Sequence, residues 1–162
     1  MQKLDHHQPR SLMSFFNDPK RIPESYGLRI AAGLIAYFLL MKFTNLAHHV
    51  ELRLLNLVIL IIGVYYALKK LREVNEHHLN YFRALITGFT TATIGSLVFA
   101  IFLFVYMKVD DDMMQAIIQG EPMGRYLNAY MAAFIVALEG VFSGLLVTFV
   151  ILNYVGTDEV NQ

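Results

Sequence analysis

Four long apolar segments, separated by short polar stretches, dominate the chain. These segments span approximately residues 26–46, 52–68, 84–107 and 130–154. Each segment has about the length that a helix needs to cross the hydrocarbon core of a bilayer. The pattern therefore predicts an all-α integral membrane protein, with four transmembrane helices in one domain over residues 26–155.

The charges of the loops predict how the chain is inserted. Nine Lys and Arg residues fall on the side that holds both termini and the second loop, against four on the other side. The positive-inside rule then places segments 1–25 and 156–162 in the cytoplasm. Residues 1–25 have no apolar core of the signal-peptide kind, so the first span is expected to direct insertion. The nine are Lys3, Arg10, Lys20, Arg21, Arg29, Lys69, Lys70, Arg72 and Arg83, and the four are Lys42, Arg53, Lys108 and Arg125.

The loop between spans three and four contains a short amphipathic pattern. Its apolar residues recur at i, i+1, i+4 and i+5 across Met113–Ile118, which predicts a short helix lying at the membrane interface. The run Asp110–Asp112 precedes it. These carboxylates could bind a divalent cation, but they would equally stabilise the N-terminus of the short helix through its dipole, and we favour that interpretation.

Small residues line one side of span four and one side of the first half of span three. Ser143 shares the small side of span four, whose opposite side is bulky and apolar. Small side chains let two helix backbones approach closely, and the predicted topology puts both small faces at the same depth. Spans three and four are therefore expected to touch. The residues assigned to helix packing are Gly88, Ala92, Gly95, Gly140 and Gly144.

A carboxylate, Glu139, interrupts the apolar run of span four at the edge of the small-residue side. A charge near mid-membrane costs about 2.5 to 3.5 kcal/mol on insertion scales, so such a residue normally faces a bundle interior, a cavity or a partner. The leading interpretation is a neutral glutamate that is hydrogen-bonded to Ser143, to threonines of span three or to another subunit. The alternatives are a carrier of protons or cations and a contact with lipid or a small ligand.

One known precedent for the carrier is the rotor ring of rotary ATPases, whose four-span proteolipids also carry one essential glutamate in the last span. Those chains are dense in glycine and alanine so that many copies can pack into a ring. This chain has 12 Phe and 9 Tyr and long charged loops, which argues against a ring.

The composition narrows the chemistry further. The 13 basic and 13 acidic residues cancel, so no nucleic-acid partner is expected. The absence of cysteine excludes disulfides, thiolate zinc sites and a cysteine nucleophile. Adjacent histidines point to different helix faces, and the default for the three pairs is a solvated interfacial position rather than a metal site. No catalytic motif is present, and we expect neither catalytic, cofactor-binding nor metal-binding residues, and no enzyme. The pairs are His6-His7, His48-His49 and His77-His78.

Three motifs resemble a small bacterial four-helix inner-membrane family of unknown function, domain of unknown function 4199. They are Lys69-Lys-Leu-Arg, the run Tyr81-Phe-Arg-Ala-Leu-Ile-Thr-Gly88, and the exit Tyr106-Met-Lys-Val-Asp110. The resemblance covers roughly residues 26–154 and implies a multi-pass protein of the bacterial inner membrane, without an assigned activity. With it, we expect a non-catalytic accessory or scaffolding subunit that packs against lipid and other integral membrane proteins. The alternative is a small oligomeric transporter, or a proton or ion pathway, that uses Glu139.

Overall fold

A computed structural model describes residues 21–44, 54–75, 80–110, 114–115, 118–119 and 124–155. Four long helices are found there, and no strand occurs among these residues. Outside this part lie residues 1–20 of the segment predicted at 1–25, the predicted segment 156–162, all three histidine pairs and half of the expected interfacial helix. The helices are α2 (Ile22–Phe43), α3 (Leu54–Val74), α4 (Tyr81–Val109) and α6 (Ala129–Val155), and a 3₁₀ turn, η3 (Gly124–Tyr126), precedes α6.

All four helices are long and apolar enough to cross a membrane. The prediction of an all-helical chain with four spans is thus confirmed, and by length and composition the chain is a multi-pass membrane protein. The helices differ in extent from the apolar runs because polar residues continue or begin them. α2 begins earlier than expected, with Pro23 and Glu24 in its first turn, where the fixed φ of proline and a negative charge suit a helix start. α3 continues through the basic residues as far as Val74.

Asparagine side chains define the start of the last two helices. The side-chain oxygen Oδ1 of Asn80 accepts a hydrogen bond from the Arg83 backbone N–H at 3.1 Å. The Oδ1 of Asn128 accepts one from the Met131 backbone N–H at 2.9 Å. Each bond satisfies a backbone donor that a helix start leaves unpaired.

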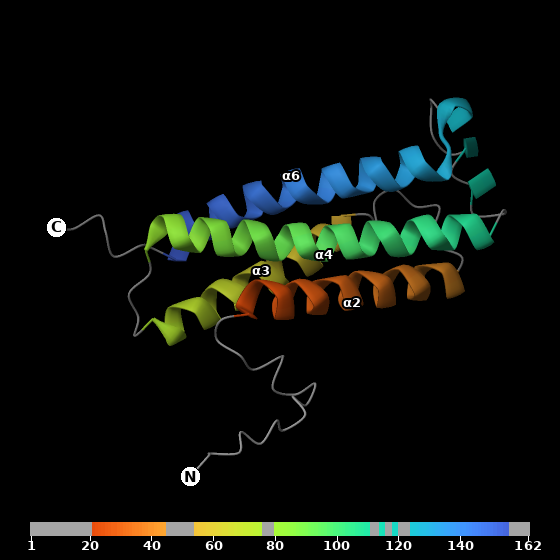
Figure 1. Ribbon diagram of the computed structural model, residues 1–162. Helices are drawn as coiled ribbons and strands as arrows, with labels where there is room; N and C mark the ends of the chain where they lie inside the picture. Colours follow the sequence, from red (N-terminus) through yellow and green to blue (C-terminus); the bar gives the residue numbers. More distant parts are fainter. Residues whose placement is uncertain are drawn as a thin grey trace, which may run out of the picture.

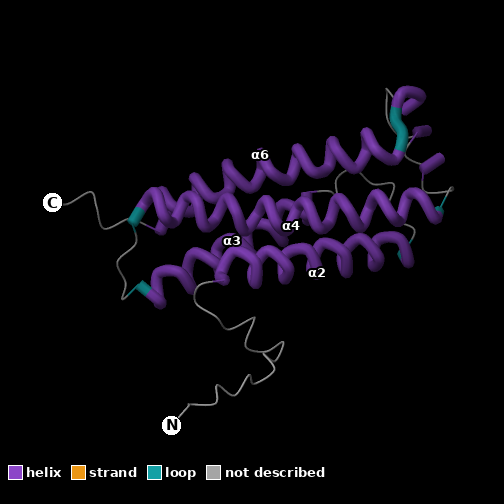
Figure 2. The backbone as a smooth tube through the Cα atoms, in the orientation of Figure 1, coloured by secondary structure: helices purple, strands orange, loops and turns teal. Residues whose placement is uncertain are grey.

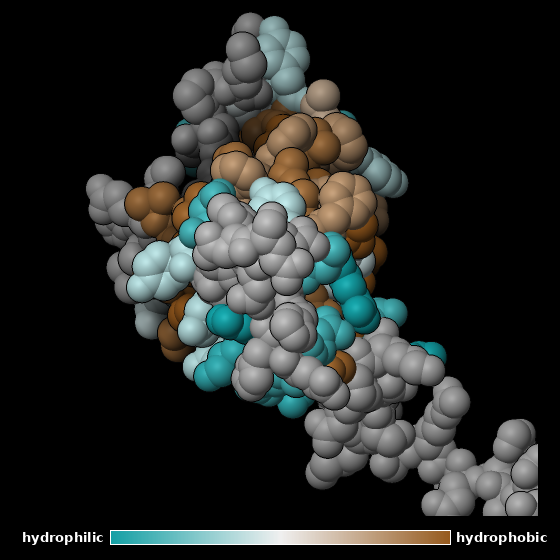
Figure 3. All heavy atoms as spheres, turned by 90° about the vertical axis from the view of Figure 1, so that its left-hand side faces the viewer, coloured by the Kyte–Doolittle hydropathy of each residue, from teal (hydrophilic) through white to brown (hydrophobic). Residues whose placement is uncertain are grey.

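Helix α4 is the centre of the bundle (Figure 1). It packs against each of the other three helices, with α2 and α6 on opposite sides of it and α3 in contact with all of them. Consecutive helices run in opposite directions, so that the starts of α2 and α4 and the ends of α3 and α6 share one end of the molecule (Figure 2). We call this the α3 C-terminal end. Seen from there, hydrophilic side chains gather at the end and hydrophobic ones lie beyond them (Figure 3).

Glycines allow α2 to approach both of its neighbours. A β-carbon on Gly27 would lie 3.0 Å from the backbone oxygen of Thr91, and one on Gly95 would lie 3.1 Å from the backbone oxygen of Gly27. The side chain of Ile30 fills the space beside Gly63 of α3 and Gly95 of α4. Gly95 was expected to face span four, but it faces α2, since it lies about 100° around α4 from Ser96, which meets α6.

Candidate functional site

The small faces of α4 and α6 are in direct contact. Gly140 lies against Ser96, Gly144 against Ala92, and Thr148 against Gly88, so a β-carbon on any of these three glycines would overlap the opposite side chain. The buried Thr148 hydroxyl donates to the Gly144 carbonyl of its own helix at 2.7 Å. This contact covers the row of Gly140, Gly144 and Thr148 on α6, which leaves the bulky side facing outward.

Glu139 lies on that outward side. It precedes Gly140 by one residue, and a rotation of about 100° carries it from the α4 contact to the exposed face. Its neighbours there are Ile135, Phe142 and Leu146, of which Phe142 is 64% exposed. Glu139 itself is exposed, and it makes no hydrogen bond or ion pair with any residue of the described segments, which include all four long helices.

Ser143, predicted to share a polar site with Glu139, is half-buried one turn further along α6. No hydrogen bond joins the two side chains in the structure. The buried hydroxyl of Thr91 in α4 is likewise turned to its own helix, where it donates to the Thr87 carbonyl at 2.7 Å. Of the three kinds of partner expected for Glu139, the two that this chain could supply do not contact it.

Glu139 also lies deep within its helix. It follows Ala129 by ten residues, or about 15 Å along the axis, and a longer part of α6 follows it. The hydrocarbon core is about 30 Å thick. A short glutamate side chain at this depth cannot reach the headgroups, so its environment in the assembled membrane is lipid or another protein.

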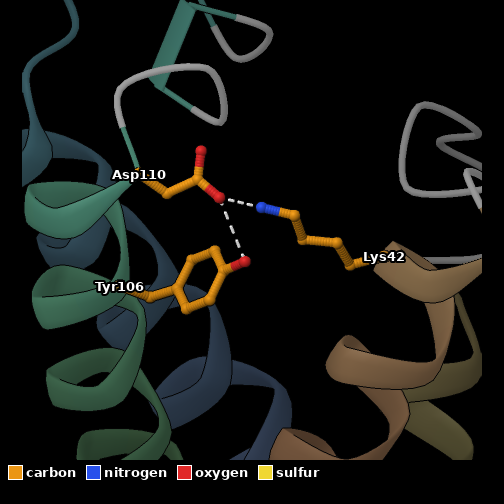
Figure 4. Close-up of polar contacts among 3 residues, drawn as sticks. All are labelled: Lys42, Tyr106 and Asp110. Carbon is orange, nitrogen blue, oxygen red and sulfur yellow. Dashed lines mark hydrogen bonds and ion pairs between the residues drawn. The ribbon is translucent and has the colours of Figure 1, made fainter.

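A polar cluster joins α2 to α4 at the end of the molecule opposite to the α3 C-terminal end (Figure 4). Lys42, in the last turn of α2, forms an ion pair with Asp110, the residue that ends α4. The hydroxyl of Tyr106 donates to the same Asp110 oxygen at 3.1 Å, and the Lys42 ammonium lies 4.6 Å from the centre of the Tyr106 ring. The Phe38 ring meets Tyr106 edge to face, with centroids 5.2 Å apart.

The sequence did not reveal this cluster. From the sequence, Lys42 was only one of the four basic residues on the less basic side, and Asp110 was part of an acidic helix start. In the structure Asp110 ends α4, with its backbone N–H on the Tyr106 carbonyl at 3.0 Å. Its own carbonyl accepts a hydrogen bond from the Met114 N–H at 3.4 Å, as the residue at a helix start does. The sequence did show Tyr106 one turn before Asp110. The ion pair between Lys42 and Asp110, however, depends on the register between the parallel helices α2 and α4. The cluster therefore connects the C-terminal ends of α2 and α4.

Metal-binding groups are not brought together in the described segments, where no three His, Asp, Glu or Cys side chains cluster. The histidine pairs and the remaining aspartates of the acidic run lie outside those segments.

A comparison with known protein families shows to which family the chain belongs. A family model described as "Protein of unknown function (DUF4199)" matches residues 25–122, which is more than half of the 162 residues. The chain belongs to the DUF4199 family. No curated protein and no solved structure matches this DUF4199 protein.

The matched region divides the molecule into two parts. It includes α2 from residue 25 onward, α3, α4 and the Lys42–Asp110 pair, and it ends before α6. Glu139 therefore lies beyond the part of the DUF4199 protein that the family model covers. The family supplies no activity, so a function has to be inferred from the geometry of this chain.

We expect the replacement of Asp110 by asparagine to lower the free energy of unfolding by about 1 kcal/mol, because the half-buried Lys42 ammonium would lose its charged acceptor. Reversible unfolding in mixed micelles would measure the effect. Glu73→Gln is the matched control, since Glu73 pairs with Lys70 at 3.2 Å while both side chains are about half exposed; its expected cost is below about 0.5 kcal/mol. Equal losses in the two variants would show that the cluster at Asp110 is no more than a surface ion pair.

Proposed function

We propose that this DUF4199 protein is a non-catalytic accessory or scaffolding subunit of a larger complex in the bacterial inner membrane. The observation that carries the proposal is the exposed carboxyl group of Glu139 in the middle of α6, which has no partner among the residues that the structure describes. A carboxyl group facing lipid alone is unfavourable, and a donor from a neighbouring membrane helix removes that cost. The partner is thus expected to present an N–H or O–H group at the depth of Glu139.

The docking surface follows from the packing of α6. Its small-residue side is filled by α4, so a partner can only approach the bulky side, and we name this surface the outer α6 face. It is a continuous apolar stripe with Glu139 at its flank. Its large members are Phe134, Ile135, Leu138, Phe142, Leu145, Leu146 and Phe149, all exposed.

For the orientation, we propose that both termini are cytoplasmic. Arg21, Arg29, Lys69, Lys70, Arg72 and Arg83 lie at or near the α3 C-terminal end. The described segments place three basic residues near the opposite helix ends, namely Lys42, Lys108 and Arg125. This distribution supports the assignment of the α3 C-terminal end to the cytoplasm.

The exposure of Glu139 also favours one other candidate. If several copies of the chain met through their outer α6 faces, the glutamates would line the interface between copies. The protein would then be a small oligomeric transporter or a proton or ion pathway rather than a subunit of a mixed complex.

Purification of the full-length tagged protein from its native membrane in mild detergent tests the proposal. We expect a stoichiometric set of other membrane proteins with the wild type. Loss of one hydrogen bond to a carboxyl group should reduce their recovery about tenfold in Glu139→Leu, with a smaller loss in Glu139→Gln, whose amide still donates and accepts. Glu73→Gln, which removes a carboxylate from the end of α3, should behave as the wild type.

Recovery of this chain alone, as a monomer, would contradict the accessory role. Recovery as a homo-oligomer, measured by native mass, would favour the pathway candidate, and proton flux into liposomes that depends on Glu139 would establish it.

A further inference from the structure

An outward-facing stripe on α3 changes from apolar to basic along the helix. Val58, Ile62, Tyr65, Lys69 and Arg72 are spaced alternately by four and three residues, which places them on one side of α3. The first three are exposed, as is Lys69, and Arg72 is half-buried. The order along the stripe is therefore hydrocarbon, aromatic ring, then two cations, over the last four turns before the α3 C-terminal end.

Arg72 is an unusual cation in this stripe. Its Nε is shielded from solvent and has no hydrogen-bond partner among the described residues. Lys69 also forms no ion pair within the described segments, whereas Lys70, one residue on, pairs with Glu73 at 3.2 Å, and Arg83 donates to Asn75 at 3.2 Å. The two terminal nitrogens of the Arg72 guanidinium group are not shielded, and they have no hydrogen-bond partner among the described residues. An external anion can therefore bind these terminal N–H groups.

The chemistry of the anion follows from the two cations. A guanidinium group presents a planar fork of donors that matches the oxygens of a phosphate, and Lys69 adds a second positive charge one turn away. Free phosphate and a phospholipid headgroup share this chemistry. The stripe continues from the cations through Tyr65 to Ile62 and Val58, and a tyrosine at this position is typical of the membrane interface. The apolar continuation selects the lipid over the free ion.

We propose that one anionic phospholipid binds along this α3 stripe, with its phosphate on Lys69 and Arg72, its glycerol region beside Tyr65 and an acyl chain over Ile62 and Val58. An anionic lipid is preferred to a zwitterionic one because the amine of a zwitterionic headgroup would be repelled by the same two cations. The site is separate from the outer α6 face and does not depend on the accessory role.

Native mass spectrometry of the full-length protein in detergent tests the site. Phosphatidylglycerol and phosphatidylcholine with identical acyl chains are titrated separately, and inorganic phosphate is added as a competitor. We expect one molecule of phosphatidylglycerol to bind saturably and at least about fivefold more tightly than phosphatidylcholine, and an equal concentration of phosphate not to displace it.

Variants locate the site. Arg72→Gln and Lys69→Gln should each weaken phosphatidylglycerol binding about fivefold, the effect of one basic residue near the membrane surface. Arg72→Lys, which keeps the charge and loses the fork, should fall between Arg72→Gln and the wild type. Lys70→Gln is the matched control, because it removes the same charge from the adjacent residue, on another side of α3.

Three results would overturn the proposal. They are equal affinities for the two lipids, displacement of the lipid by inorganic phosphate, and a loss in Lys70→Gln as large as that in Lys69→Gln. Thermal unfolding in phosphatidylcholine micelles checks that each variant is folded. If Arg72→Gln is not folded, the site is tested with Lys69→Gln, whose position is exposed.

Discussion

Replacement of Gly144 by alanine is expected to destabilise the bundle by about 1 to 3 kcal/mol, although alanine is the better helix former. The added methyl group would overlap the β-carbon of Ala92. That atom is attached directly to the α4 backbone, so it cannot rotate away, and the two helices would have to separate. Because lipid tails are as apolar as leucine, close packing is a main source of helix association in a bilayer, and its loss is felt directly.

The clash can be tested by a compensating change. Ala92→Gly removes the overlapped atom, so the double variant Gly144→Ala with Ala92→Gly should recover at least half of the stability lost, as measured by reversible unfolding in mixed micelles. Gly33→Ala is the control, since its β-carbon would meet a single side-chain atom, the Ile59 Cγ2 at 3.2 Å, and a shift of a few tenths of an ångström would relieve that contact. Additive effects of the two changes would contradict the contact.

The sequence predicted the fold well because each membrane span corresponds to a long run of apolar residues. Hydrophobicity located all four helices. Polar residues such as Asn80 and Asn128 determine some of the helix ends through local hydrogen bonds, which the apolar runs do not show. The small residues predicted close contacts, but they did not specify the neighbour. Gly88 faces α6 whereas Gly95 faces α2, and this distinction depends on where α2 sits around α4.

The candidate sites were predicted less completely, for a physical reason. The position of Glu139 at the edge of the small-residue stripe was readable, but an edge residue can turn inward or outward. The contacts of Gly140, Gly144 and Thr148 with α4 fix the rotation of α6. The Lys42–Asp110 pair joins residues 68 positions apart. No local pattern contains the helix register that brings such residues together.

Ile30 connects the packing of three helices, and its replacement by alanine is expected to cost about 2 kcal/mol or more. The side chain is 2% exposed and fills the space that Gly63 of α3 and Gly95 of α4 leave open. Isoleucine-to-alanine changes in the cores of soluble proteins cost about 2 to 5 kcal/mol, part of it from transfer out of water. The lower end applies here because the separated helices remain in an apolar solvent, so the cost is mainly that of the cavity.

The same cavity provides the test. A β-carbon on Gly63 would overlap only the Ile30 side chain, so Gly63→Ala should be destabilising in the wild type and stabilising in Ile30→Ala, where the new methyl group enters the cavity. The sign of its effect on the unfolding free energy should therefore reverse between the two backgrounds, which a purely local effect on α3 would not produce. Leu40→Ala, which truncates a 61% exposed residue of α2, should change stability by less than about 0.5 kcal/mol because its side chain leaves no cavity between helices.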